Sequence, residues 1–410
     1  EVMQFIVMTI GCIGVGIVAY QTVTIEQLNA VIPEGWKTLS FGWNLELNLE
    51  GTPYPQVNEK LESDGFTLFG GLFVLMVLKG ILASTAGPVP SYDMQRILAA
   101  KKPSEAAKMS FLTVAVLYIP RYFMVVGFAV LALVYLGPEI SAMGPDIDFE
   151  KILPMTMNAH LPVGLKGIML AGFLAAFMGT FAAFINAAPA YIVNDIYKKY
   201  IHPGASGKKL VRLSIITSLV LVCIGIIFGF NAGSLNSLIL WLSSALYGGY
   251  VAANVLKWVW WRFTGSGYFW GMLFGLIAST IKLFFFPQYV DIFVFPLIFA
   301  FSLLGCIIGT YATPFPNPES VAAFYKQTRP WGFWKPVREK VMALDPTFIP
   351  NRHFKRDGFN VIVGVVWQMA QLLIPVYFMI RENGQMVLWS GVFLLCSWLL
   401  KKYWWNTLED

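Results

Sequence analysis

Three polar or helix-breaking residues lie deep inside an apolar stretch of this chain. Thr180, Asn186 and Pro189 belong to the run from Ile168 to Val193, which contains no charged residue. At about 1.5 Å rise per residue, this run is long enough to cross a hydrocarbon core of roughly 30 Å. A hydroxyl, a carboxamide and a carbonyl freed by proline are costly at that depth unless they line a cavity or hold an ion. The stretch 164–201 therefore predicts either a cation site built from oxygen atoms or a helix that packs through its many small residues.

A second polar stretch follows the apolar run that begins at Phe66. Its candidate substrate-binding residues are Ser84, Thr85, Ser91 and Tyr92, and Pro88 and Pro90 lie between them. Two prolines two residues apart cannot sit in a regular helix. Unwound backbone inside a membrane is tolerated only against protein or a water-filled cavity, and broken helices are typical of transporter binding sites. The alternative interpretation is a helix that ends near Thr85 and continues as a loop.

A third set of polar and aromatic side chains lies between Leu235 and Lys257. Trp241, Ser243 and Ser244 form a stripe amid apolar residues. They are either further substrate-binding residues that face a cavity or residues of a plain helix-packing surface.

The composition identifies the class of protein. Hydrophobic residues make up 57% and charged residues 13% of the 410 residues, against about 45–50% and 25% in soluble domains. The chain is therefore an all-α polytopic membrane protein. Its formal charge of +6 comes from basic residues that cluster in alternate loops, so it indicates no nucleic-acid partner. The four cysteines fall in apolar runs and the three histidines are dispersed, so neither type forms a metal-ligand set.

About ten membrane spans can be delimited by their apolar runs. We expect them at residues 3–24, 66–90, 108–136, 163–194, 210–231, 234–257, 268–286, 291–312, 360–380 and 386–401. The loops 25–65 and 137–162 are acidic, whereas the loops 91–108, 195–212 and 313–358 are basic. By the positive-inside rule, the basic loops and the C-terminus are predicted to be cytoplasmic.

These stretches resemble the sodium/solute symporter family, and its bacterial members most. The match to the eighth core helix of that family consists of Ala175-Ala176-Phe177-Met178-Gly179-Thr180, then Asn186 and Asn194-Asp195-Ile196-Tyr197-Lys198. The loop after the sixth core helix is matched by Gln95-Arg96-Ile97-Leu98-Ala99-Ala100-Lys101, followed by Glu105-Ala106. Two shorter matches are Glu1-Val2-Met3-Gln4-Phe5, at the start of the fifth core helix, and Trp260-Trp261-Arg262 with Gly271-Met272 and Gly275.

The resemblance implies a LeuT-like inverted-repeat fold and half of a sodium site. In the family, Na⁺ is bound through the groups at Ala176, Gly179 and Thr180, and Ala176 and Thr180 stack on one helix face because they are four residues apart. The family usually has Ser where this chain has Gly179, so one hydroxyl ligand is missing, and water or the Gly179 carbonyl are its candidate replacements. Tyr92 falls on the gating tyrosine of the family. Pro90-Ser91 replaces the Asn-Gln pair of the sugar transporters, which weakens the prediction of a sugar as substrate.

The predicted function is sodium-coupled symport of a small polar solute such as a sugar, an amino acid or a carboxylate. The alternative is a membrane sensor or input domain that resembles a transporter and does not transport, whereas an enzyme is not expected because no catalytic constellation is found. The transporter core would span 1–257, peripheral helices 258–312 and 359–410, and a cytoplasmic loop 313–358. The expected partners are the solute, the lipid bilayer of a bacterial inner membrane, and N-terminal helices of the same protein that would complete the first repeat.

Overall fold

The computed structural model describes residues 2–32, 42–45, 47, 57–63, 65–87, 97–143, 148–231, 235–286, 289–315 and 317–408. Within these ranges the chain is helical, apart from turns and one isolated β-bridge between Trp260 and Phe333. The predictions for Ser91 and Tyr92 fall outside the described residues. So do the side chains of Trp241, Ser243 and Ser244, although their backbone belongs to a described helix.

The long helices follow the expected spans closely. They are α1 (Val2–Thr22), α4 (Phe69–Thr85), α6 (Pro103–Tyr135), α9 (Val163–Ala190), α10 (Gly207–Asn231), α11 (Leu235–Val259), α12 (Gly265–Phe285), α13 (Asp291–Tyr311), α16 (Phe354–Met379) and α17 (Asn383–Tyr403). The short helices are α2 (Ile25–Val31), α3 (Val57–Ser63), α7 (Gly137–Ala142), η1 (Phe149–Lys151), α8 (Ile152–His160), α14 (Pro318–Thr328), α15 (Lys335–Leu344) and η3 (Trp405–Thr407). A π-helical segment, η2 (Tyr191–Ile201), continues α9.

Eight helices in the described part of the chain are long and apolar enough to cross a membrane. They correspond to α1, α6, α9 with η2, α10, α12, α13, α16 and α17 with η3. The other two expected spans coincide with α4, a shorter apolar helix, and with α11, which has 25 residues. The chain is therefore an integral, multi-pass membrane protein.

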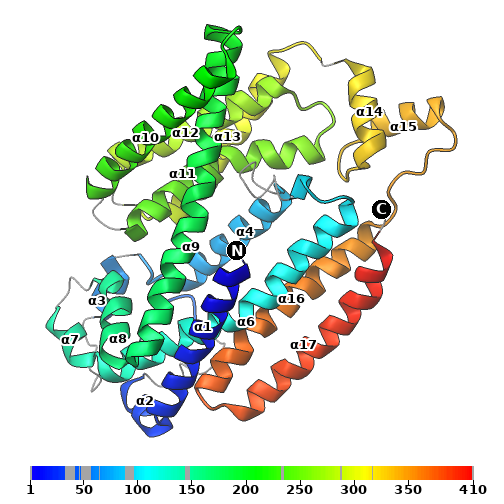
Figure 1. Ribbon diagram of the computed structural model, residues 1–410. Coiled ribbons are helices and arrows are strands. Elements are labelled where there is room, and N and C mark those ends of the chain that lie inside the picture. The colour runs from blue at the N-terminus through cyan, green and yellow to red at the C-terminus, as the bar shows by residue number, and fades with distance from the viewer. Residues whose placement is uncertain are drawn as a thin grey trace.

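One group of helices consists of α4, α11, α12 and α13, which lie together behind the other helices in Figure 1. Glycine lets α11 and α12 approach closely, because a Cβ on Gly275 would collide with the backbone of Gly249. Ser302 of α13 is fully buried and donates its hydroxyl to the carbonyls of Gly249 at 2.7 Å and Gly271 at 2.9 Å. A single side chain thus ties three spans together in a low-dielectric interior.

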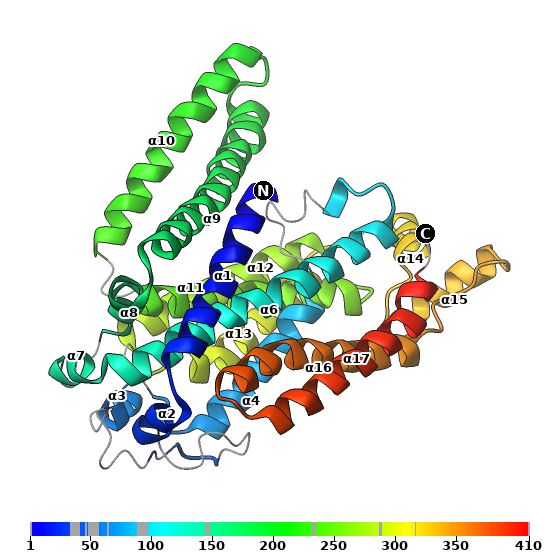
Figure 2. The same cartoon turned by 60° about the horizontal axis from the view of Figure 1, so that its bottom comes forward.

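A second group consists of α1, α6, α16 and α17, of which α16 and α17 lie side by side in Figures 1 and 2. Its core includes Ala19 from α1, Leu131 from α6, and Leu373 and Tyr377 from α16. Arg381, between α16 and α17, donates to the carbonyls of Tyr20 and Val23 at 3.0 and 3.1 Å. The guanidinium therefore satisfies carbonyl groups at the end of α1 that have no intrahelical partner.

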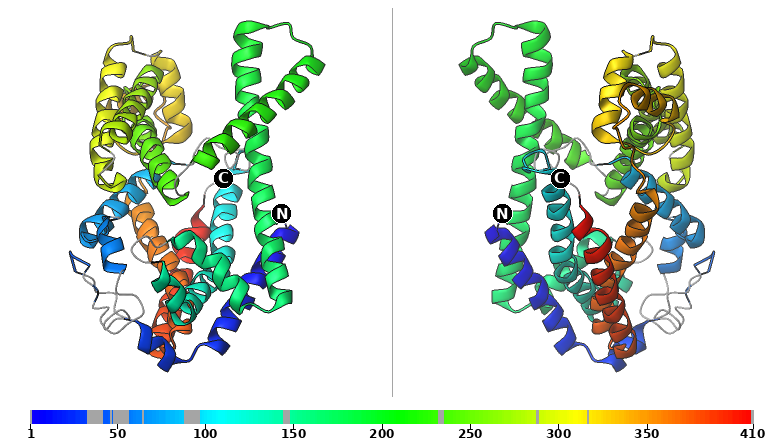
Figure 3. Two further views of the ribbon diagram at one scale, coloured as in Figure 1. Left: turned by 90° about the vertical axis from the view of Figure 1, so that its left-hand side faces the viewer. Right: turned by 90° about the vertical axis from the view of Figure 1, so that its right-hand side faces the viewer.

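The hairpin of α9 and α10 projects from the rest of the molecule, as Figures 2 and 3 show. Helix α9 packs on α1 along part of its length, and α10 packs on α9 and η2. No residue of the most apolar 18-residue window of α10 is buried. This hairpin therefore offers apolar surface on both of its helices to lipid or to further protein.

The short helices divide between two ends of the molecule. In Figure 1, α2, α3, α7 and α8 lie at the lower left, whereas α14, α15 and the start of α6 lie at the upper right. The first set belongs to the acidic loops and the second to the basic ones. We call the second the basic end, which the positive-inside rule predicts to be cytoplasmic.

The basic segment 313–358 is more ordered than the solvated linker that we expect from its sequence. Helices α14 and α15 pack through Tyr325, Trp334, Val337 and Val341, all of which are buried. The indole of Trp334 donates to the carbonyl of Trp258 at 2.7 Å, which anchors the pair to the end of α11. The aromatic residues of this segment therefore build a small core of their own.

Candidate functional site

The three residues of the predicted sodium half-site lie on one exposed stretch of α9. Ala176, Gly179 and Thr180 are all exposed, and the α-helix is continuous through them. The Ala176 carbonyl therefore keeps its place in the helical hydrogen-bond pattern. Because a carbonyl oxygen has two lone pairs, it can still accept a second partner such as a cation.

The hydroxyl of Thr180 does not bond back to its own helix, a property that it shares with Thr9, Thr217 and Thr310 among the described long helices. Thr85, Thr113 and Thr280 each donate to the carbonyl four residues earlier, at 2.8 to 2.9 Å. Thr180 forms no such bond, and no other hydrogen bond of its hydroxyl is found among the described residues. An unbonded hydroxyl on an apolar span costs free energy unless a ligand or water satisfies it.

Helices α1 and α9 run antiparallel and interlock through glycines. Met169 and Leu165 of α9 press against Gly11 and Gly14 of α1, and Met8 of α1 presses against Gly172. Further along the same interface between α1 and α9, a polar side chain of α1 lies beside the proposed ion site. The carboxamide of Gln4 lies beside Gly179, with its Oε1 3.3 Å from the position of an added Cβ.

Gln4 is the polar group that sequence reasoning did not assign to the ion site. Its carboxamide forms no hydrogen bond with the residues that the structure describes, and the side chain is half-buried. It occupies the space into which a serine side chain at position 179 would project. The signal was present in the sequence, since Gln4 belongs to the Val2-Met3-Gln4 match, but the contact depends on the packing of α1 on α9.

Pro189 does not interrupt the helical path, contrary to its interpretation as a helix breaker: α9 ends one residue later, at Ala190, and the π-helical η2 continues it. Pro189 removes the N–H group that would bond to the carbonyl of Ile185. The hydroxyl of Ser218 on α10 lies 3.0 Å from the Ile185 carbonyl and 3.0 Å from the Ser214 carbonyl of its own helix, so the two carbonyls share this donor. The freed carbonyl thus contributes to the contact between α9 and α10.

The Asn194-Asp195-Ile196-Tyr197-Lys198 motif lies in η2, at the turn of the hairpin. Tyr197 accepts a backbone hydrogen bond from His202 at its carbonyl, and its ring contacts His202 and the ammonium group of Lys209. These contacts close the turn into α10. The motif therefore has a structural role in shaping the hairpin, and π-helical geometry is common near functional sites.

The candidate substrate residues of α4 lie at its C-terminal end. Ser84 and Thr85 are exposed, and Gly87, with a φ of +79°, accepts the left-handed conformation that terminates the helix. Gly87 lies beside the indole of Trp258, so the end of α4 meets the end of α11. Along α11, Trp258 is about 20 Å from Ser244. The structure thus places the α4 residues and the Trp241–Ser244 stretch at different levels.

The part of the chain that matches known proteins includes the helices α1, α4, α9 and α11 described above. The family model described as "Sodium:solute symporter family" matches residues 2–275, which is more than half of the chain.

Three similar proteins are named as cotransporters. A sodium/glucose cotransporter of Vibrio parahaemolyticus is 29% identical over 202 residues, or 46% of this chain and 36% of the relative. Sodium/glucose cotransporter 4 of Danio rerio is 27% identical over 219 residues, or 50% and 33%. Human sodium/myo-inositol cotransporter 2 is 27% identical over 206 residues, or 46% and 30%. This chain thus spans about a third of the length of these relatives. The chain belongs to the sodium:solute symporter family, a family of transporters and not of enzymes.

Proposed function

We propose that this chain forms part of a transporter that couples the movement of Na⁺ to the uptake of a small polar solute. Family membership implies a LeuT-like fold, in which two repeats rock around a central site. The observation that carries the proposal is the exposed face of α9, where the Thr180 hydroxyl has no hydrogen bond among the described residues and the Gln4 carboxamide lies beside Gly179.

The chemistry of this face suits a hard monovalent cation. Hard cations bind oxygen ligands, and backbone carbonyls can replace part of the hydration shell of an alkali ion. The Ala176 carbonyl and the Thr180 hydroxyl lie one helical turn apart on the same face. We propose that the Gln4 carboxamide oxygen, beside Gly179, supplies the ligand that a serine at 179 would otherwise provide.

The solute would bind at the ends of discontinuous helices, as in other transporters with inverted repeats. Ser84 and Thr85, where α4 ends, are the described candidates, and we retain Ser91, Tyr92, Trp241, Ser243 and Ser244 as further candidates. The printed names of the relatives point to glucose and myo-inositol, whereas Pro90 and Ser91 favour a screen that extends beyond sugars.

The driving force is the electrochemical gradient of sodium. Each charge that moves inward across 100 mV contributes about 2.3 kcal/mol in addition to the chemical gradient. We propose that sodium favours the outward-open state, that the solute then binds, and that a rocking motion releases both on the other side.

The test is uptake into proteoliposomes under an imposed sodium gradient, with sugars, polyols, amino acids and carboxylates as solutes. We expect uptake by the wild type to require Na⁺ and not K⁺, and Thr180→Ala to lower the apparent affinity for sodium. Thr280→Ala is the matched control, because Thr280 also lies on a candidate span, is half-buried, and bonds to the Leu276 carbonyl of its own helix at 2.8 Å. If the wild type shows neither sodium-dependent uptake nor stabilisation by sodium, the proposed coupling is contradicted and the sensor alternative is favoured.

A further inference from the structure

A cavity of 1120 Å³ lies at the basic end of α6, α16 and α17, away from the proposed ion site. Its walls come from residues 107–114 of α6, the segments 327–331 and 349–353, the first turns of α16, and residues 400–408. All three helices are candidate membrane spans, and the cavity adjoins their terminal turns. It therefore lies where lipid headgroups meet the ends of the helices. Most of its walls lie beyond residue 275, where the match to the symporter family ends.

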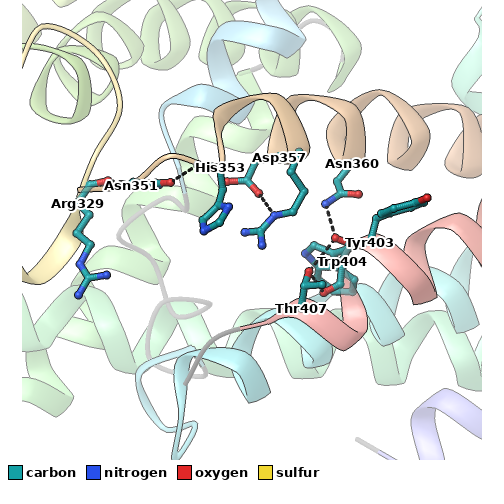
Figure 4. A network of polar contacts seen from close by, with 9 residues as sticks. Arg329, Asn351, His353, Asp357, Asn360, Tyr403, Trp404 and Thr407 are labelled. Atoms are coloured by element: carbon teal, nitrogen blue, oxygen red, sulfur yellow. Dashed lines mark hydrogen bonds and ion pairs between the residues drawn. The ribbon is translucent and has the colours of Figure 1, made fainter. Parts of the chain in front are cut away.

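The charged side chains that line this cavity carry more positive than negative charge. Arg329 and Arg356 line it, with Asp357 as the acidic residue among the lining side chains. Arg356 bonds to the Asp357 carboxylate through Nε at 3.0 Å, which leaves its terminal N–H groups for another acceptor. The Arg329 guanidinium stacks on Phe348 at 5.5 Å and makes no ion pair with the described residues. In Figure 4, Arg329 and His353 project to the side of α16 on which Trp404 and Thr407 lie.

A buried acceptor in the cavity wall lacks a donor. Asn360 is 8% exposed, and its Nδ2 donates to the Tyr403 carbonyl at 3.0 Å, as Figure 4 shows. Its Oδ1 is buried and has no hydrogen bond to the described residues. An acceptor left unpaired in this way costs free energy unless a ligand or water donates to it. The Oδ1 atom is itself enclosed by protein, so the groups that the cavity offers to a ligand are the arginine side chains. The cavity therefore suits a ligand that carries an anionic group.

The inner part of the cavity is apolar and aromatic. Phe111 of α6 stacks on Trp367 of α16 at 4.5 Å, and Trp404 closes the same wall at 5.1 Å from Phe111. Trp367 is held in place by its hydrogen bond to Ser397 at 2.9 Å. A Cβ on Gly364 would meet no atom within 4 Å, so the α16 face beside the cavity is open. This slot suits an acyl chain.

From these contacts we propose that the cavity binds an anionic phospholipid of the bilayer, of the phosphatidylglycerol type. The phosphate binds to the terminal N–H groups of Arg356, Arg329 adds positive charge to the same cavity, and an acyl chain follows Gly364. Basic pockets between spans are recognised sites for anionic lipid headgroups, and Trp331 and Trp404 provide the aromatic residues typical of a membrane interface. The occupant comes from the bilayer leaflet at the basic end.

Native mass spectrometry of the full chain in a neutral detergent tests the proposal. Phosphatidylglycerol and phosphatidylcholine with the same acyl chains are added in equal amounts. We expect the wild type to retain more phosphatidylglycerol, and Arg329→Gln to lower this preference by about fivefold. Arg356→Gln is expected to act in the same direction. Arg352→Gln is the matched control, since Arg352 is exposed, follows Asn351 in the chain and does not line the cavity.

A second pair of variants tests the acyl slot without changing charge. Gly364→Leu is expected to lower retention of both lipids, whereas Gly391→Leu on α17, also open to 4 Å, leaves it unchanged. Equal retention of the two lipids by the wild type, or an undiminished preference in Arg329→Gln, would overturn the proposal. If glycerol phosphate displaces phosphatidylglycerol when the two are present at the same concentration, the site binds a soluble phosphate compound and the lipid proposal is overturned.

Discussion

The Oε1 atom of Gln4 lies 3.3 Å from the position that a Cβ on Gly179 would occupy. The two residues come from α1 and α9, which are far apart in the chain and antiparallel in space. The glycine and the carboxamide are thus complementary, because the small residue leaves the room that the oxygen fills. If this oxygen binds sodium, the two positions are coupled.

Removal of the Gln4 carboxamide together with introduction of a serine hydroxyl at position 179 is therefore expected to preserve the dependence of uptake on sodium. Gln4→Ala should lower the apparent affinity for sodium, by tenfold for each loss of about 1.4 kcal/mol. The double variant Gln4→Ala with Gly179→Ser should recover much of it, since a hydroxyl then lies where the carboxamide was. Uptake against sodium concentration is the measurement, with Gln385→Ala on α17 as control. If uptake by the wild type depends on sodium and Gln4→Ala has the same apparent affinity for sodium, Gln4 is not a sodium ligand. The proposal of sodium-coupled symport would be unaffected.

Ser218 is expected to stabilise the hairpin of α9 and α10. Its hydroxyl donates to the carbonyl that Pro189 leaves without an N–H partner. Ser218→Ala should therefore lower the free energy of unfolding by about 0.5–1.5 kcal/mol, the net contribution of a typical hydrogen bond. Pro189→Ala in the same background restores the backbone donor and should recover part of this loss. Unfolding in mixed micelles measures the four combinations.

The control for this cycle is Ser390→Ala, because Ser390 bonds only to the Met386 carbonyl of its own helix at 2.7 Å. Equal losses for Ser218→Ala in the wild-type and Pro189→Ala backgrounds would show that the hydroxyl and the proline are independent.

The positions of the spans were predictable from the sequence, because an apolar run of sufficient length has few alternatives to a membrane helix. The matches around Ala176 and Gln95 also led to the correct family. Single residues were harder to interpret. Pro189 breaks a helix by its local chemistry, yet Ser218 from a neighbouring helix satisfies the carbonyl that it frees.

The same limit applies to the site. The role proposed for Gln4 depends on the interlocking of α1 with α9, which no local pattern encodes. Likewise, the aromatic residues of 313–358 are typical of an interfacial anchor, whereas Trp334 and Tyr325 pack against each other with ring centroids 5.7 Å apart. Long-range packing decides both cases.

The contact between α14 and α15 is expected to weaken in acid. Hydrogen bonds from the Thr347 hydroxyl and the Lys326 ammonium group hold the pKa of the Asp345 carboxyl below its ordinary value of 3.8. When folding lowers the pKa of a carboxyl, the ionised carboxylate stabilises the folded state at every pH above the pKa that the group has in the unfolded chain. This stabilisation is lost as the pH falls through the lower pKa of the folded state. Hydrogen exchange of 318–344, corrected for intrinsic rates, should therefore be faster in Asp345→Asn than in the wild type at neutral pH.

This difference should shrink once the pH falls below 3.8. Glu339→Gln, which removes an exposed carboxylate 3.9 Å from Lys335, should change exchange little at any pH. A difference between Asp345→Asn and the wild type that stays constant into acid would argue against the ionised carboxylate as its source.

The ion pair between Lys282 and Asp291 joins the end of α12 to the start of α13. Its Nζ and Oδ1 atoms are 2.8 Å apart, and the two side chains are 8% and 15% exposed. Removal of one partner leaves a buried charge without compensation, so Asp291→Asn should cost about 3–5 kcal/mol of unfolding free energy. Lys282→Met in addition removes that charge and should recover part of the loss, since apolar groups often replace a buried pair at little cost, whereas Lys79 still lacks the Asp291 charge with which it interacts. The same unfolding assay compares this cycle with the exposed Lys335–Glu339 pair, where each change should cost no more than about 1 kcal/mol. Equal losses of unfolding free energy for the two pairs would mean that water reaches Lys282 and that the packing of α12 on α13 does not depend on the Lys282–Asp291 ion pair.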